Sequence, residues 1–140
     1  MILVTANPAR QLVQVRMFGR VEPAQVAQGR AELTTLLAGV ADGFQLLVDL
    51  SELESMDIAC AAEMGRIMEL CSQHRVSLVV RIMPDPAKDI GMNILSAFHY
   101  HHRPRIITCR TLLEAGQALK LDQTDLGPGR SAATEASGQT

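Results

Sequence analysis

The sequence predicts a single α/β domain with a mixed β-sheet, an N-terminal hairpin and four main helices. Three observations carry this prediction. Two short strand-like runs stand first, apolar strand runs then alternate with stretches of helical periodicity, and one of these strand runs is apolar on both faces. Right-handed crossovers between the alternating segments would place the later strands parallel in one sheet. The expected order is β-β-α-β-α-β-α-β-α.

The first two runs are expected to form the hairpin, followed by a helix. The runs flank "ANPAR", a turn that contains Asn-Pro. In the second run Val13, Val15 and Met17 alternate with polar residues, which is the period of a half-buried strand. Residues 22–40 follow with apolar residues at helical spacing and a proline in the first turn, where proline suits a helix.

The middle of the chain predicts a central strand and a long helix. The run "GFQLLVDL" closes at Asp49, and a loop is expected from there to Asp57. Asp57 is placed to cap the next helix, "IACAAEMGRIMELCSQHR", by accepting a backbone N–H hydrogen bond worth about 1 kcal/mol. The core face of this helix is expected to carry Cys60, Met64, Ile67 and Cys71.

The remaining elements are two strands and two helices. The run "VSLVVRIM" is rich in β-branched residues and predicts a strand, and the "PDP" after it suits the opening of a helix. The run "PRIITC" predicts the last strand. Thr111 and Glu114 then form a capping box at the start of the last helix, in which each side chain accepts a hydrogen bond from a backbone N–H of the other residue.

Composition sets the expected boundaries of the domain. Hydrophobic residues make up 47% of the 140 residues, enough for a core, and aromatic residues only 3%, so that the core must be aliphatic and rich in methionine. Residues 1–120 are expected to form the domain. Residues 121–140 hold little that could pack in a core, and we expect a flexible C-terminal tail.

Charge and cysteine content restrict the partners and the compartment. The net charge of −2 gives no broad attraction to nucleic acid or to anionic membranes. Three cysteines without a metal-type pair indicate reduced thiols, and no apolar run approaches the roughly 18 residues of a membrane helix. A cytoplasmic protein is therefore predicted, with neither nucleic acid nor membrane among its partners.

The order of elements, with "LLVDLSELESMD" in its middle, resembles the STAS domain, a family named after sulphate transporters and anti-sigma-factor antagonists. The matching features are an apolar strand that ends in Asp-Leu-Ser, a short loop, and a hydrophobic residue followed by Asp at a helix start. The resemblance covers residues 1–120. It implies a single STAS-like domain that binds a protein partner, such as an anti-sigma factor or a kinase-like regulator, in bacterial signalling.

The resemblance fails at the site where the family's antagonists are phosphorylated. These antagonists carry Asp-Ser-Ser/Thr-Gly between the loop and the helix. Asp57 matches the Asp, whereas Ile58, Ala59 and Cys60 stand where the hydroxyl residues and the glycine would be. Ala59 falls at the position of the phosphate acceptor and has no oxygen. The scaffold is therefore expected without phosphorylation at Ala59.

A protein-binding surface is expected at the carboxyl edge of the sheet. The start of the second helix and the segment after the next strand follow adjacent parallel strands, so both should lie at this edge. The small and charged side chains there suit a modest, reversible contact. The expected partner-binding residues are Ser55, Asp57, Ile58, Ala59, Ala62, Glu63, Arg66, Asp85, Lys88 and Asp89.

Two polar clusters suggest other chemistry, and we interpret both as structural. His99, His101 and His102 suggest zinc, but His101 would not share a helical face with the other two, so a polar helix end is favoured. The helix start at residues 85–91 resembles an anion site, but Asp85 and its acidic neighbour would repel an anion. We expect neither a metal nor a cofactor.

Three single side chains leave a second interpretation open. Cys60 stands near a helix N-terminus, where a thiolate is stabilised, and a Cys–His enzyme would need an imidazole within hydrogen-bond reach of it. Helical spacing favours a core role for Cys60. Ser51 and Ser55 carry the hydroxyls of the loop, and bonds to the local backbone are a commoner role for such serines than phosphate acceptance. No pair of carboxylates has an acid–base spacing, so no enzyme is predicted.

Two functions from different classes follow. The first is a non-enzymatic protein-interaction module, for which a homodimer stays open. The alternative is a binding domain for a small apolar or lipid-type ligand, which methionine-rich cores permit because methionine lines irregular spaces. An enclosed pocket would favour the ligand, whereas an exposed apolar patch over a close-packed core would favour the protein partner.

Overall fold

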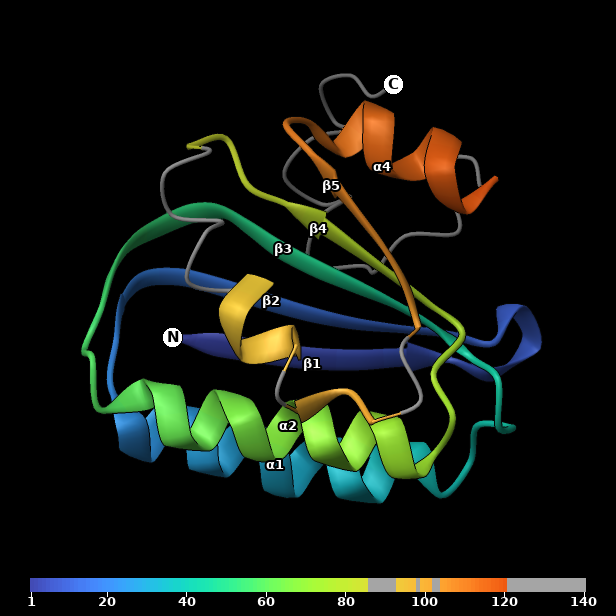
Figure 1. Ribbon diagram of the computed structural model, residues 1–140, viewed down its shortest axis with the longest axis horizontal. Coiled ribbons are helices and arrows are strands. Elements are labelled where there is room, and N and C mark those ends of the chain that lie inside the picture. The colour runs from blue at the N-terminus through green and yellow to red at the C-terminus, as the bar shows by residue number, and fades with distance from the viewer. Residues whose placement is uncertain (86–92, 98, 102–103, 121–140) are drawn as a thin grey trace.

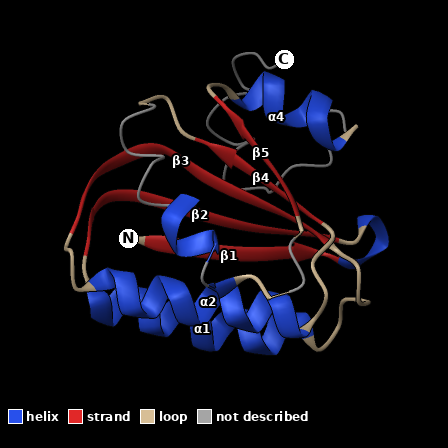
Figure 2. Ribbon diagram, in the orientation of Figure 1, coloured by secondary structure: helices blue, strands red, loops and turns tan. Residues whose placement is uncertain are grey.

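The computed structural model describes residues 1–85, 93–97, 99–101 and 104–120 of the chain. Figure 1 shows one twisted sheet between two helical layers, and Figure 2 separates its strands from its helices. The elements with their bounds are β1 (Ile2–Asn7), a 3₁₀ turn (Pro8–Arg10), β2 (Leu12–Val21), α1 (Pro23–Leu37), β3 (Gln45–Met56), α2 (Cys60–Gln73), β4 (Leu78–Ile82), β5 (Arg105–Cys109) and α4 (Leu112–Leu119). Residues 93–97 and 99 are also helical.

The sheet has the predicted mixed topology. Its strand order is β1-β2-β3-β4-β5, with β1 antiparallel to β2 and the other neighbours parallel. The hairpin, the crossovers and the mixed α/β class are therefore confirmed. The expected tail, residues 121–140, lies outside the described residues, and so does the expected helix start at residues 85–91 except for Asp85.

The two faces of the sheet bury two cores of unequal size. Helices α1 and α2 lie side by side against one face, and α4 covers part of the other (Figure 1). Leu46 and Val48 of β3 pack toward α1 and α2, while Leu47 packs with the α4 residues. β3 is the middle strand of five, which explains why its sequence is apolar on both faces. The larger core holds Met17, Met64, Met68 and Met83, as expected from the methionine content.

Local capping at the last helix follows the prediction. Thr111 Oγ1 accepts a hydrogen bond from the Glu114 N–H at 3.2 Å, and Glu114 Oε1 accepts from the Thr111 N–H at 3.3 Å. These bonds satisfy backbone donors that the helix start leaves without intrahelical partners. The capping box is therefore confirmed.

The prediction of a loop between Asp49 and Asp57 is wrong, because β3 continues through these residues to Met56. This second half of the strand pairs with the end of β2, up to Val21 beside Met56, across two shifts of register. One shift lies beside Gly19, whose φ of +68° is a conformation that glycine adopts without strain. Bulges of this kind bend a strand pair, and Figure 1 shows β2 and β3 curving together toward the helices.

The second helix begins later than expected. α2 starts at Cys60, and Ile58 and Ala59 lie in a turn before it. No helix in the described part of the chain is long and apolar enough to cross a membrane.

Candidate functional site

The junction between β3 and α2 is a tight turn built around Asp57. The Asp57 N–H still donates to the Val21 carbonyl of β2 at 3.1 Å, so Asp57 is anchored to the end of the sheet. Asp57 Oδ1 then accepts from the Ala59 N–H at 2.8 Å, and the Asp57 carbonyl accepts from the Cys60 N–H at 2.8 Å. This is an Asx-type turn, in which the carboxylate satisfies a backbone donor two residues ahead. Asp57 therefore shapes the entry to α2 through this turn. The residue directly before the first turn of α2 is Ala59.

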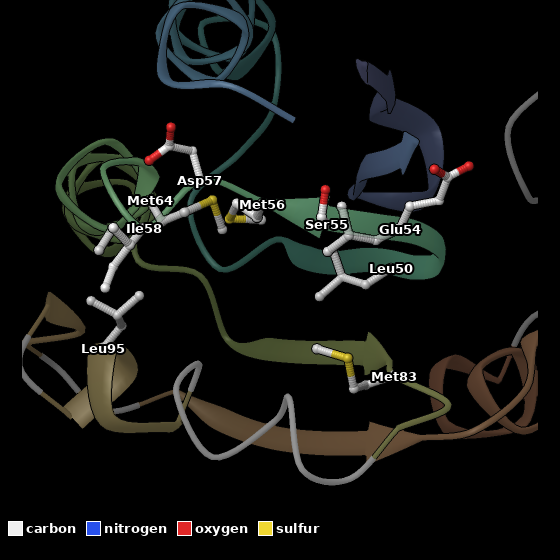
Figure 3. A pocket seen from close by; sticks show the side chains of 11 residues that line it. Leu50, Glu54, Ser55, Met56, Asp57, Ile58, Met64, Met83 and Leu95 are labelled. Atoms are coloured by element: carbon white, nitrogen blue, oxygen red, sulfur yellow. The ribbon is translucent and has the colours of Figure 1, made fainter. Parts of the chain in front are cut away.

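A surface pocket of about 480 Å³ lies beside this junction. Figure 3 shows the end of β3, the turn and the start of α2 on one side of it, with Met83 after β4 and Leu95 of the helical segment opposite. Its lining is mostly apolar, and Ile58 and Leu95 point toward one another across it (Figure 3). The lining residues are Leu50, Leu53, Glu54, Ser55, Met56, Asp57, Ile58, Ala61, Met64, Met83 and Leu95.

The rim of the pocket is open to solvent and acidic. Ile58 is 90% exposed, the highest value among the large hydrophobic residues exposed in the described part of the chain. Glu54, Ser55 and Asp57 are also exposed, and the two carboxylates point away from the apolar side chains (Figure 3). Of the described lining residues, only Glu54 and Asp57 are charged, and both are negative. An apolar floor under an acidic rim defines this site.

The structure brings part of the predicted surface together at this pocket. Ser55, Asp57 and Ile58 line it, and Ala59 lies exposed in the turn between them and α2. The exposed face of α2 beyond the pocket carries the predicted Ala62 and Arg66, and the predicted Asp85 is exposed after β4. The predicted residues Lys88 and Asp89 lie outside the described residues.

The predicted residue Glu63 is half-buried and links α2 to α1. Its side chain is 18% exposed, and its Oε1 accepts from Arg30 Nε of α1 at 3.2 Å. Its Oε2 accepts from Arg66 Nη1 at 2.7 Å. Glu63 therefore has ion-pair partners within the chain, and its part in partner binding stays a prediction.

Polar contacts that the sequence did not predict hold one wall of the pocket. Arg81 of β4 is 1% exposed, and its Nη1 donates to Asn93 Oδ1 at 2.9 Å while its Nη2 donates to Ser96 Oγ. Asn93 and Ser96 belong to the helical segment that also carries Leu95. The sequence feature that could have predicted these contacts is Arg81 inside the apolar run "VSLVVRIM". A buried guanidinium needs hydrogen-bond partners from a neighbouring segment.

His99 joins the same segment to α2. Its Nδ1 lies 2.5 Å from Glu69 Oε2, and its ring covers Gly65, where an added Cβ would stand 2.6 Å from His99 Nε2. The expected polar helix end is thus a specific contact between two elements. Among the described residues no group of three or more His, Cys, Asp or Glu could hold a metal, and the absence of zinc stays a prediction because His102 lies outside them.

Cys60 has the environment of a core thiol. Its side chain is fully buried, and its Sγ donates to the Val21 carbonyl at 3.6 Å. Burial, assisted by the negative charge of Asp57, raises the pKa of the Cys60 thiol above its ordinary value. A raised pKa opposes the thiolate that the enzymatic interpretation needs.

The serines of the β3–α2 region differ in accessibility. Ser51 is half-buried and donates to the buried Asp49 carboxylate through both its N–H, at 3.0 Å, and its hydroxyl, at 2.6 Å. Asp49 therefore has structural partners, as expected of a carboxylate in a buried strand. Ser55 is exposed at the pocket, so it is the more accessible of the two hydroxyls.

Comparison with solved structures identifies the fold. The anti-sigma factor antagonist SpoIIAA in its unphosphorylated form matches with a TM-score of 0.60 and 19% identity over 86% of this chain and 98% of SpoIIAA. Phosphorylated SpoIIAA, described as a Bacillus cell fate determinant, matches with a TM-score of 0.58 and 17% identity over 85% of this chain and 99% of SpoIIAA. A protein of the DUF3478 family from Shewanella loihica, described as uncharacterised and with a SpoIIAA-like fold, matches with a TM-score of 0.64 and 14% identity. The match covers 85% of this chain and 92% of that protein.

The chain has a SpoIIAA-like fold. No family model matches the sequence, and no curated protein matches it. The likeness therefore rests on structure, and at these identities it concerns the fold. The STAS-like architecture expected from the order of elements is confirmed.

Proposed function

We propose that this protein is a non-enzymatic interaction module of bacterial regulation that works in the cytoplasm and binds a protein partner at the β3–α2 junction. One observation carries the proposal: Ile58 is 90% exposed at the mouth of an apolar pocket, at the carboxyl ends of parallel strands of the sheet. Exposed apolar surface next to a pocket is typical of a binding site. The SpoIIAA-like fold adds support, because solved antagonists of anti-sigma factors share it.

The proposal differs from a phosphorylation switch at the start of α2. Ala59 and Ile58 carry no hydroxyl, and Cys60 is buried. Incubation with Ser/Thr kinases and peptide mass mapping should find no phosphate between residues 57 and 60. Phosphorylation of Ser55 in good yield would instead show that the acceptor has moved to the exposed serine of the pocket.

A capture experiment with matched variants tests the interaction. Ala62 is exposed on α2 next to the pocket, and Ala31 is exposed on α1. Ala62→Arg should abolish recovery of the partner from the native cytosol, whereas Ala31→Arg should leave it unchanged. Both variants should melt near the wild-type temperature, since exposed substitutions usually change stability by about 0.5 kcal/mol or less. Equal recovery by all three proteins would contradict the proposal.

The pocket also favours a second candidate, a small apolar or lipid-type ligand. Its volume of about 480 Å³ is within the range of ligand pockets, and its walls are mostly leucine and methionine side chains. Solvent extraction of the purified chain followed by mass spectrometry tests this candidate. Recovery of one apolar compound per chain would favour the ligand over the protein partner, provided that the compound is lost when a bulky substitution fills the pocket.

A further inference from the structure

We propose that the partner inserts a large apolar side chain into the pocket and places basic residues against Glu54 and Asp57. This inference rests on the proposed function and specifies the chemistry of the partner. It commits to a peptide segment in which a leucine, isoleucine, methionine or aromatic anchor is flanked by Lys or Arg.

The walls of the pocket account for the apolar anchor. Three of the lining side chains are methionines, Met56, Met64 and Met83, and the leucines at 50, 53 and 95 complete the floor and the far wall. Methionine side chains are flexible and can repack around an inserted group, so the pocket can accept apolar anchors of different shapes. Anchors that fill such pockets at the centre of an interface contribute most of its binding energy.

The rim accounts for the basic flanks. Glu54 and Asp57 are exposed, and neither takes part in an ion pair within the described part of the chain. The Asp57 carboxylate accepts one hydrogen bond from the turn, and this bond also fixes its position. Figure 3 shows the two carboxylates on different sides of the apolar side chains. A negative rim repels anionic groups and steers positively charged partners toward the pocket.

The charge pattern also limits the alternatives. A phosphorylated or otherwise acidic peptide would meet two carboxylates of like charge, which is unfavourable. A purely apolar peptide would fill the pocket and bring no positive charge to either rim carboxylate. The segment that satisfies the whole site therefore combines the apolar anchor with positive charge on either side.

Selection of a random peptide display library on the full chain tests the proposal. Enriched peptides should carry a large apolar residue next to Lys or Arg. Ala61→Phe, which places a ring in the pocket, should weaken their binding about tenfold or more, a loss expected for a blocked anchor. The matched control Ala31→Phe, at an exposed position of α1, should bind as the wild type does.

Charge variants test the flanks separately. Glu54→Gln should weaken binding by about twofold to fivefold at low salt and by less at high salt, because rim charges act mainly on association. Glu32→Gln, an equal change at an exposed position of α1, should have no effect. Ile58→Ser removes apolar surface at the pocket mouth without touching the core, and should also weaken binding.

Enrichment of acidic peptides, enrichment without an apolar anchor, unchanged binding to Ala61→Phe or a library that yields no binder would each overturn the inference. If Ala62→Arg still abolishes capture of the native partner while Ala61→Phe and Glu54→Gln do not weaken it, the interaction module stands and only its partner chemistry is wrong. If no variant affects capture, both proposals fail.

Discussion

At the scale of single residues, Asp57 has a structural role and a proposed recognition role, which a substitution can separate. Its carboxylate holds the turn before α2 through the Ala59 N–H, and its charge belongs to the acidic rim of the pocket. An asparagine keeps an acceptor oxygen at the same place and removes the charge. The two roles therefore predict different effects of Asp57→Asn and Asp57→Ala on stability and on peptide binding.

We predict that Asp57→Asn unfolds at nearly the wild-type urea concentration, whereas Asp57→Ala loses about 1 kcal/mol, the usual effect of removing a side-chain acceptor at a helix entry. Urea denaturation at neutral pH measures both. Both variants should weaken peptide binding, because both remove the negative charge. Equal stability of Asp57→Ala and the wild type would show that the bond to Ala59 contributes nothing.

Gly65 offers a test of the contact between α2 and His99. A Cβ at residue 65 would lie 2.6 Å from His99 Nε2, and the imidazole is held in place by Glu69. We predict that Gly65→Ala destabilises the wild type by about 1–3 kcal/mol, as overpacking does. In the His99→Ala background the same change should be neutral or stabilising, since alanine is the better helix former by about 1 kcal/mol. Thermal melts of the wild type, the two single variants and the double variant measure this double-mutant cycle. Equal effects of Gly65→Ala in both backgrounds would contradict the contact between Gly65 and His99.

At the scale of secondary structure elements, the buried Cys71 of α2 is expected to couple the stability of the fold to alkaline pH. Burial raises the pKa of the Cys71 thiol from 9.0 to about 12. Between these values the unfolded chain loses the thiol proton and the folded chain keeps it, so the unfolded state is favoured as pH rises. The contribution of Cys71 to stability is complete below pH 9 and is lost progressively toward pH 12.

We predict that the free energy of unfolding falls as pH rises above about 9, and that Cys71→Ala makes this fall shallower. Burial also raises the pKa of the Tyr100 hydroxyl, so Tyr100→Phe should have an effect of the same sign. Urea titrations from pH 8 to pH 11 measure the slopes. Cys109→Ala removes another thiol whose pKa is raised by burial, and it should act in the same direction. An unchanged slope in all three variants would rule out these three buried acids as the cause.

The elements that the sequence predicted correctly depend on nearby residues. The capping box of α4 needs only Thr111 and Glu114, and the core face of α2 follows from the spacing of Cys60, Met64, Ile67 and Cys71. Such patterns are visible in a short window because the interacting groups are neighbours in the chain.

The elements that the sequence did not predict depend on distant partners. The second half of β3 contains "SELES", which resembles a loop, and it is a strand because the end of β2 pairs with it through bulges. The start of α2 moves to Cys60 because the Asp57 turn is anchored to Val21. The pocket likewise needs Leu95, whose segment is held by the buried Arg81. No local pattern contains these partners.

At the scale of the whole molecule, the fold places the exposed Ile58 and the apolar pocket at one edge of the sheet. Strands β3 and β4 are parallel neighbours, so the residues that follow them approach each other at their carboxyl ends. The bend of β2 and β3 then carries the start of α2 over this edge (Figure 1). The pocket lies where these features meet, whereas α1 and α4 serve the two cores of the sheet.

Hydrogen–deuterium exchange of the full chain, alone and with the partner captured from the native cytosol, tests the central claim most directly. Binding at the pocket should slow exchange between residues 53 and 66 and in the segment at residues 93–97, with α1 and α4 unchanged. Ala62→Arg, mixed with the same partner, should lose this protection. Protection confined to β1, α1 or α4 would place the interface elsewhere and contradict the account.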